Sequence, residues 1–426
     1  MVEYWKKAAC VLGIGSWTDS LDFAVLMYTV AMLVTEWGIG PVETTWIITG
    51  FGISGYISMV IGLLTGPLMD YFGRKKIWVL GNAVAGISYL FAATAANWMQ
   101  VAIYRMIGVW TVGFTLTAWY VMLPEEVPAD KRQFILGLTG LLNTIGATTV
   151  YGLMALSGLF PWLTWRVMCL FTGLADLAAT VMGIIWLREP PIWQERRKLM
   201  KEGKIKKEEQ RMSYRELLGP KWRKKFLVLM WLPIVFAATG LATATSGYLS
   251  FFQAAVMKFP APLIGMIGVV SQVIIACTRP IIGKLSDKFG RLNSLLFGAI
   301  PGLIGMLLLW HTNVLIGVGP SLTVIAGYVF FYFLWSLAGW SQQDTARLAL
   351  AEAFPTVARG TAQSLSTGVI ASLIMTPLGV VSGLLATVIS PSDAYSIVPT
   401  IGFIVGITAV LIAKKLGYET AGKALE

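Results

Sequence analysis

The chain has 426 residues, of which 56% are hydrophobic and 13% are charged, and its mean hydropathy is +0.71. An ordinary soluble domain carries about a quarter charged residues, so this composition excludes that class and predicts a polytopic helical membrane protein. The net charge of +11 does not indicate nucleic-acid binding, because Lys and Arg gather in alternate loops, where they carry topology information.

Apolar windows between charged or Pro/Gly breaks predict twelve membrane-spanning helices. Their limits are 10–34, 45–69, 77–96, 98–123, 134–158, 164–187, 226–252, 262–284, 292–311, 318–341, 361–386 and 394–413. The basic loops lie on the side of the N-terminus, which predicts cytoplasmic termini and a place in the plasma or cell membrane. The first apolar run is too long for a signal-peptide core, so we expect it to be retained.

One loop divides the twelve spans into six and six. Residues 188–225 hold 14 basic and 6 acidic residues. We interpret them as a basic cytoplasmic linker between an N-terminal six-helix bundle (1–187) and a C-terminal six-helix bundle (226–426). The charge spacing also allows short amphipathic helices on the anionic inner leaflet, and both interpretations stay open.

Two loop motifs recur in the same order in the two halves. "GPLMDYFGRKK" (66–76) and "GKLSDKFGRLN" (283–293) share G-x-L-x-D-x-F-G-R, and they follow the second and eighth spans. "PEEVPADKRQ" (124–133) and "AEAFPTVARG" (351–360) share E-x-x-P-x-x-x-R after the fourth and tenth spans. Duplicated halves around a central site are a known plan of transporters.

At these motifs the chain resembles the major facilitator superfamily, and "REPPIW" (188–193) is similar to the P-E-S-P-R-W run of several of its branches. The resemblance covers essentially the whole length. It implies an all-α membrane protein with two pseudo-symmetric six-helix bundles and a cavity between them. It also implies alternating access, with the protein working as a monomer.

The resemblance further implies that the duplicated loops hold the cytoplasmic side closed. Glycines permit the tight turns, and Asp and Arg four residues apart can pair or cap helix ends. The alternative is that these residues only fix loop shape. The candidate gate residues are Gly66, Asp70, Gly73, Arg74, Glu125, Arg132, Gly283, Asp287, Gly290, Arg291, Glu352 and Arg359.

Two carboxylates, Asp19 and Asp22, lie inside the first span. They are three residues apart and share a helix face, where two carboxylates in a low dielectric cannot both ionise cheaply. An acid that gains and loses a proton is what proton coupling requires. The resemblance implies that Asp22 pairs with Arg105 of the neighbouring fourth span for this purpose. A static ion pair is the alternative, and Asp19 is either a second proton site or a cavity residue.

The remaining charges inside spans are weaker indicators. Arg279 either faces the cavity or reaches toward the nearby loop, and Asp344 and Arg347 are expected to satisfy each other. We expect Asp176 to be a structural hydrogen-bond acceptor rather than a titrating group. Polar or aromatic residues expected around the cavity are Tyr28, Trp119, Tyr120, Asn143, Gln272, Trp335, Trp340, Gln342 and Gln343.

We therefore predict a proton-coupled symporter of a small anionic, carboxylate-type metabolite. "WTDSLDF" is similar to the first span of organic-acid and phosphate symporters of the family, and Arg105 and Arg279 offer positive charge to an anion. Sugar or polyol symport is the alternative, although "IVFAATGLATATSGYLSFFQ" lacks the paired glutamines of sugar porters. A proton-driven exporter or a non-transporting sensor stays open.

No enzyme signature occurs in the sequence. There is no phosphate-binding loop, and the single histidine, His311, excludes a nucleophile–histidine set. The three cysteines fall in apolar runs without metal-ligand spacing. We expect no cofactor and no metal, and as partners only substrate, protons and membrane lipids.

Overall fold

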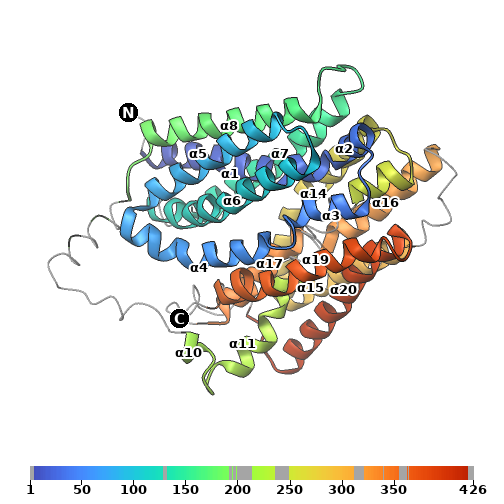
Figure 1. Ribbon diagram of the computed structural model, residues 1–426. Coiled ribbons are helices and arrows are strands. Elements are labelled where there is room, and N and C mark those ends of the chain that lie inside the picture. Colours follow the sequence, from blue (N-terminus) through green and yellow to red (C-terminus); the bar gives the residue numbers. More distant parts are fainter. Residues whose placement is uncertain are drawn as a thin grey trace. The chain divides into compact units, whose positions relative to one another are not determined.

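The computed structural model describes residues 4–127, 132–190, 194, 198, 214–235, 249–310, 321–338, 340–354, 362 and 364–420. Within these ranges all regular structure is helical (Figure 1). The chain forms two compact units. The first comprises residues 1–39, 46–209 and 261–269, and the second comprises 40–45, 210–260 and 270–426.

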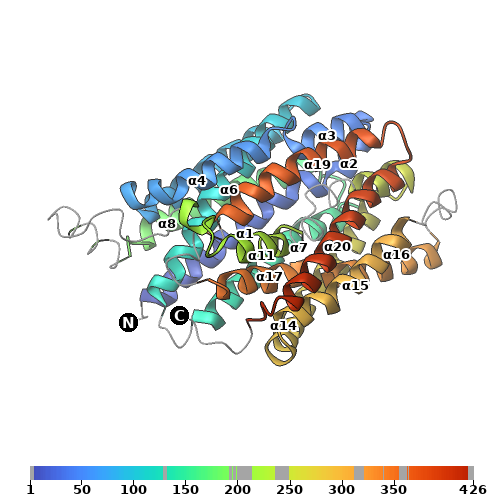
Figure 2. The same cartoon turned by 90° about the horizontal axis from the view of Figure 1, so that it is seen from below.

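The first unit is built around the first helix. α1 packs against α6, α7 and α8, α5 packs against α6 and α8, and α4 packs against α6 (Figures 1 and 2). The helices are α1 (Tyr4–Tyr28), α2 (Val30–Trp37), α3 (Pro41–Thr49), α4 (Ser54–Phe72), α5 (Arg74–Ala93), α6 (Trp98–Glu126), α7 (Arg132–Leu156) and α8 (Trp165–Trp186). Of α3, only residues 46–49 belong to this unit. The first and second predicted spans are thus each two helices separated by a short break.

A pair of glycines lets α5 and α8 approach closely. A Cβ atom on Gly86 would lie 2.9 Å from the carbonyl oxygen of Gly173, and one on Gly173 would lie 2.7 Å from that of Gly86. Small residues permit such backbone contact between membrane helices. The crossing brings Asp176 to α5, because the same Cβ on Gly86 would lie 3.1 Å from its Cβ.

The apolar core of this unit surrounds Trp78, which is fully buried. Its ring lies between α1 and α8, where Cβ atoms on Gly15 and Gly183 would come within 2.3 and 2.4 Å of it. Trp119 belongs to the same buried cluster. Close van der Waals packing of this kind stabilises the association of helices within a membrane.

The second unit is arranged around α15, which packs against α16, α17 and α20. Its helices are α10 (Tyr214–Leu217), α11 (Arg223–Leu229), α14 (Ala261–Phe289), α15 (Arg291–Trp310), α16 (Leu322–Ala338), α17 (Trp340–Glu352), α19 (Ala371–Leu385) and α20 (Pro391–Lys415). Of α14, residues 270–289 belong to this unit. Two π-helical turns, η2 (Phe252–Val256) and η4 (Ser364–Ile370), accompany them. Ser390 caps α20 by accepting a hydrogen bond from the Asp393 N–H (3.2 Å).

Seven stretches of the described helices are long and apolar enough to cross a membrane. They are Tyr4–Trp37, Pro41–Thr65, Arg74–Ala93, Trp165–Trp186, Ala261–Thr278, Arg291–Leu308 and Asp393–Lys415. Each of the twelve predicted spans overlaps a described helix. The seventh span is described only at residues 226–235 and 249–252.

Candidate functional site

Three buried carboxyl groups come together inside the first unit. Asp19 and Asp22 of α1 are 3% and 2% exposed, and Asp176 of α8 is fully buried. The carboxyl group of Asp22 is repelled by those of both Asp176 and Asp19. The sequence placed the two α1 acids on one face, and the structure adds Asp176 as their neighbour. The expected role of Asp176 as a structural hydrogen-bond acceptor stays a prediction.

These acids have few hydrogen-bond donors. The Thr115 hydroxyl of α6 donates to Asp19 Oδ1. Asp19 Oδ2 and Asp22 Oδ1 accept no hydrogen bond from any described residue. The carboxyl group of Asp176 interacts with the Thr18 hydroxyl and with the carboxyl group of Asp22. Buried charge without a partner is expensive and seldom kept without a use. Carboxyl oxygens of this kind can hold a proton.

Arg105 of α6 lies in the same unit, and its side chain is held by backbone rather than by an acid. It is 1% exposed, and its Nη1 donates to the carbonyl oxygens of Ile47 (3.2 Å) and Ile48 (2.7 Å) at the end of α3. Its Nε and Nη2 donate to no described residue. These two atoms form the edge of the guanidinium whose parallel N–H groups match a carboxylate.

The expected ion pair between Asp22 and Arg105 is not formed in this structure. Both side chains belong to the described part of the chain, and no salt bridge or hydrogen bond joins them there. The contacts of the Arg105 guanidinium that the structure describes are instead those of Nη1 with the carbonyl end of α3. α1 and α6 are nevertheless neighbours, as expected.

Tyr89 of α5 lies between the two expected partners. Its hydroxyl donates to the backbone carbonyl of Asp22. Its ring packs over Gly108, where a Cβ atom would lie 2.6 Å from Cε2, one helical turn after Arg105. Sequence reasoning missed this residue.

Asn82 and Thr18 extend the same polar cluster between α5 and α1. Thr18 Oγ1 lies 3.3 Å from Asn82 Oδ1, and Asn82 Nδ2 donates to the Trp78 carbonyl (2.9 Å). The sequence does contain one signal that could have pointed to α5, which is the spacing of Asn82 and Tyr89. They are seven residues apart in an apolar run, which puts both on one helix face.

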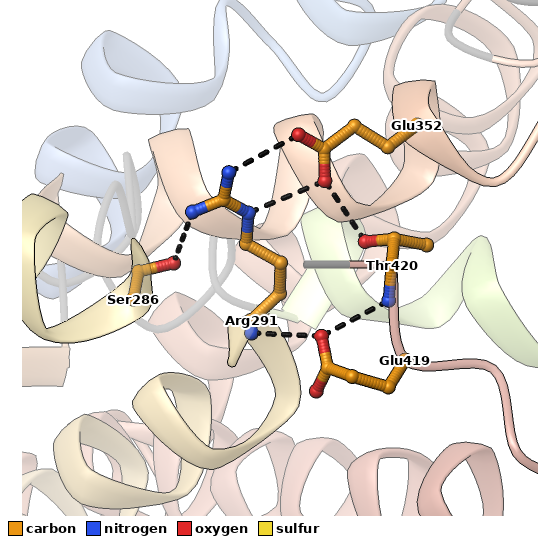
Figure 3. A network of polar contacts seen from close by, with 5 residues as sticks. All are labelled: Ser286, Arg291, Glu352, Glu419 and Thr420. Carbon is orange, nitrogen blue, oxygen red and sulfur yellow. Dashed lines mark hydrogen bonds and ion pairs between the residues drawn. The ribbon is translucent and has the colours of Figure 1, made fainter. Parts of the chain in front are cut away.

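The second unit contains a loop network that includes two of the predicted gate residues (Figure 3). Arg291 binds Glu352 through two parallel contacts, Nη2–Oε1 at 3.1 Å and Nε–Oε2 at 3.2 Å. Its Nη1 donates to Ser286 Oγ (3.0 Å), and Thr420 Oγ1 donates to Glu352 Oε2 (2.9 Å). The duplicated motifs therefore meet in space within this half.

A carboxylate caps the helix after the glycine of each duplicated motif. Glu189 accepts from the N–H groups of Arg74 (2.8 Å) and Lys75 (3.2 Å) at the start of α5. Glu419 accepts from those of Arg291 (2.9 Å) and Leu292 (3.0 Å) at the start of α15. Each carboxylate satisfies orphan donors and the positive helix end. Both were missed, although each Glu follows the sixth helix of its half.

The glycine before each capped helix has a backbone that other residues rarely adopt. Gly73 has φ +110° and Gly290 has φ +95°. Cβ atoms there would lie 2.2 Å from Glu189 Oε1 and 2.8 Å from Glu419 Oε2. The duplicated glycines are thus explained by backbone conformation and by room for the carboxylate.

A further ion pair lies at the end of α6, next to the predicted gate residue Glu125. Arg188 Nη2 is 3.3 Å from Glu126 Oε2, and the guanidinium stacks on Tyr4, with Cζ 3.8 Å from the ring centroid. Burial raises the pKa of Glu126 above its ordinary value, and Arg188 opposes the rise. Glu126 lies beyond the predicted end of the fourth span.

The other candidate cavity residues that the structure describes are largely engaged in packing. Tyr28 stacks on Tyr151, with ring centroids 4.0 Å apart. Asn143 Nδ2 donates to the Ser16 carbonyl (2.8 Å), and Gln342 Nε2 donates to that of Ser294 (2.9 Å). Gln272 and Trp335 are buried.

Several predicted residues lie outside the description. Arg359 falls in an undescribed segment. The helix positions of the following are described but their side chains are not: Gly66, Asp70, Tyr120, Glu125, Arg132, Arg279, Gly283, Asp287, Trp340 and Gln343. The same holds for Asp344, so its pairing with Arg347 stays a prediction.

Comparison with known families decides the class of this protein. Residues 12–380 match the model of the Major Facilitator Superfamily. The chain belongs to the Major Facilitator Superfamily. The crystal structure of a D-xylose-proton symporter superposes with a TM-score of 0.74 at 20% identity, covering 99% of this chain and 100% of that one. The predicted major facilitator fold is confirmed, and the protein is an integral membrane transporter.

Curated relatives in this superfamily are similar over different lengths. The glucose transporter GlcP of Staphylococcus epidermidis is 26% identical over 87% of this chain and 86% of its own length. The niacin transporter NiaP of Acinetobacter baylyi is 25% identical over 55% of this chain and 57% of its own. A gallate transporter of Pseudomonas putida is 27% identical over 39% of this chain and 36% of its own.

Proposed function

We propose that this transporter carries a small carboxylate together with a proton. The observation that supports it most is the free Nε–Nη2 edge of buried Arg105. A buried donor without a partner is unfavourable, and a carboxylate can take both N–H groups of this edge in parallel. The substrate anion would therefore gain charge-assisted hydrogen bonds that the resting protein leaves unmade.

The acid cluster supports the proton part of the proposal. Asp22 is the proposed proton acceptor, and Asp19 and Asp176 are the like-charge neighbours that respond to its protonation. One proton and one carboxylate together change the charge of the site by zero. The loaded and empty carriers then have equal charge, whereas a half-loaded carrier has an additional buried charge, which is costly in a membrane. This difference links the two cargoes.

Two of the similar proteins support a carboxylate in particular. Niacin and gallate, the cargoes named for the transporters of Acinetobacter baylyi and Pseudomonas putida, are both aromatic carboxylic acids. Each of these relatives matches only part of this chain, so the substrate class is transferred as a proposal.

Reconstitution tests the proposal directly. Purified protein in liposomes is given labelled nicotinate or gallate with an inward pH gradient, and uptake is followed with and without a protonophore. We expect accumulation that collapses with the gradient and is lost in Arg105→Gln. Uptake that ignores the gradient would exclude obligatory proton coupling, and an Asp22→Asn variant that still concentrates substrate would refute the role of Asp22.

A sugar is the second candidate substrate. The match to the glucose transporter GlcP extends over most of both chains, whereas the match to the niacin transporter covers little more than half of each. The same liposomes distinguish the two candidates. Glucose uptake without nicotinate or gallate uptake would favour the sugar, whose neutral hydroxyl groups have less need of the Arg105 edge.

We also propose that the duplicated loop motifs and the carboxylates that cap their helices form a gate on the cytoplasmic side. Both termini are proposed to lie on that side, and the protein is proposed to act as a monomer. The bidentate Arg291–Glu352 pair and the Glu189 and Glu419 caps support a network that can open and close. Glu352→Gln or Asp70→Asn should change transport rate more than equilibrium binding. Loss of binding in a folded variant contradicts the gate.

A further inference from the structure

The second membrane span is interrupted. α3 ends at Thr49 and α4 begins at Ser54, and the stretch Pro41–Thr65 reads as one candidate span. Between them Gly50, Phe51 and Gly52 have φ values of +54°, +56° and +76°. The equivalent span of the second half, α14, runs unbroken from Ala261 to Phe289. The fold itself therefore does not demand the interruption.

The interruption frees backbone groups that a continuous helix would pair. The Phe51 N–H donates to the Trp46 carbonyl (3.1 Å), and the Gly52 N–H donates to Thr49 Oγ1 (3.1 Å). The carbonyls of Ile47 and Ile48 accept from Arg105 Nη1. At membrane depth, non-helical backbone is tolerated only where protein satisfies it or where it lines a cavity.

The segment also has the strain expected of a functional position. Phe51 is a non-glycine residue in the left-handed region, which persists only where the surroundings hold it. Its ring centroid lies 6.4 Å from that of Trp46 and 6.3 Å from that of Trp98. A Cβ on Gly50 would lie 2.8 Å from Ser54 Cβ and 3.1 Å from Met106 Cγ, next to Arg105.

The carbonyl end of α3 explains how the buried positive charge of Arg105 is stabilised although no described acid pairs with it. The last carbonyls of a helix carry partial negative charge and lack intrahelical donors. They stabilise a cation, yet they occupy only Nη1. An aspartate in their place would take the carboxylate-binding edge and compete with an anionic substrate.

We propose that the break at residues 49–53 is a built part of the carboxylate site, with Gly50 and Phe51 as positioning residues for Arg105. The break exposes the Ile47 and Ile48 carbonyls, these hold Nη1, and the Nε–Nη2 edge is thereby aimed and left open. Carboxylate binding at that edge fixes the guanidinium from both sides and stiffens the break. The identity of the ligand rests on the proposed function, whereas the clamp of Arg105 on α3 does not.

Hydrogen–deuterium exchange of the full chain in lipid nanodiscs tests the clamp without any ligand. Arg105→Met should speed exchange of the amides of residues 51–53 by about tenfold, equivalent to about 1.4 kcal/mol. Exchange around Gly38, a left-handed glycine (φ +62°) with nothing within 4 Å of its Cβ position, should not change. Arg166→Met is the control for loss of an arginine elsewhere in the unit, because Arg166 donates to the Ala95 carbonyl (3.1 Å) and pairs with Glu36 (2.6 Å), and it should leave the exchange of residues 51–53 unchanged. Equal exchange in wild type and Arg105→Met overturns the proposal.

Transport kinetics test the positioning role. Gly50→Ala should raise KM for nicotinate or gallate by about tenfold with little change in maximal rate, while Gly38→Ala leaves both unchanged. Phe51→Gly keeps the left-handed backbone but removes the ring contacts, so it serves if Gly50→Ala does not fold, and it should raise KM likewise. In wild type, nicotinate or gallate should slow exchange of residues 51–53.

The outcomes separate the two proposals. If neither acid binds to wild type, the proposed substrate is wrong and the Arg105→Met exchange result alone decides the clamp. If an acid binds and is transported, but KM and the exchange of residues 51–53 are unaffected, the positioning role is wrong and the proposed function stands.

Discussion

The hydroxyl of Tyr89 donates a hydrogen bond to the backbone carbonyl of Asp22. Tyr89 also packs over Gly108, one turn from Arg105, so a neutral side chain lies where a direct ion pair was expected. The proposed proton acceptor and the proposed anion binder can therefore influence each other through α5 without touching.

Tyr89→Phe removes this hydrogen bond and keeps the ring packing. We expect a loss of about 1 kcal/mol in the free energy of unfolding and an altered pH profile of transport, because the hydroxyl holds the backbone of Asp22 and the ring packs one turn from Arg105. Tyr104→Phe is the control, since Tyr104 stacks on Phe91 away from the acids. An unchanged pH profile in Tyr89→Phe would remove Tyr89 from the coupling pathway.

Thr115→Val should show how much the Thr115 hydroxyl stabilises the buried carboxyl group of Asp19. The isosteric change deletes the hydroxyl that donates to Asp19 Oδ1, leaving a buried acceptor unsatisfied at about 1–3 kcal/mol. Thr115→Ser should restore stability, as measured by thermal unfolding in detergent. In a double-mutant cycle with Asp19→Asn the two losses should not add; additive losses would mean that the contact is unimportant.

Two glycines of α7 make a matched pair. A Cβ on Gly146 would lie 2.3 Å from the Trp17 carbonyl oxygen of α1, whereas nothing lies within 4 Å of that position on Gly152. Gly146→Ala should therefore destabilise the protein by about 1–3 kcal/mol through overpacking. Gly152→Ala should stabilise it by up to about 1 kcal/mol through helix propensity. Unfolding midpoints of both variants check the contact between α1 and α7.

Glu126 should contribute a defined pH dependence to stability. Its folded-state pKa is raised, chiefly by burial, so the folded state holds its proton more tightly than the unfolded state does. Stability should fall as the pH rises from the ordinary glutamate value through the raised one, and the loss is complete above it. Glu126→Gln should flatten this part of the curve. A steeper decline in the variant would contradict the sign.

Much of the fold could be predicted because it depends on local patterns. Each span predicted from hydropathy overlaps a described helix, and two motifs shared by the halves pointed to the family that the comparison shows. The interruption at residues 49–53 was not predicted, because a window over 45–69 averages out "GFG" when its neighbours are apolar. The resemblance placed Asp22 and Arg105 on neighbouring helices, as α1 and α6 are, but nothing in the sequence pointed to the carbonyls of Ile47 and Ile48 that hold Arg105.

Long-range partners were beyond a single sequence. Glu189 and Arg74 are 115 residues apart, and Glu419 and Arg291 are 128 apart. Nothing in local spacing connects them. Asp176 was visible as an intramembrane charge, yet its meeting with Asp22 depends on how α8 packs against α1, which residue spacing alone does not show.

The two carboxylate caps have a consequence for how the gene can be divided. Each half supplies its own cap, Glu189 for α5 and Glu419 for α15. If the chain is split after Glu189, inside the basic linker, both glutamates stay on the same fragment as the helices that they cap. If it is split just before Glu189, the fragment that contains α5 lacks its capping carboxylate. The first pair of fragments should reassemble when co-expressed, and the second should not. Each half of the chain thus carries the glutamate that caps its own helix, so each can be encoded on a separate gene segment.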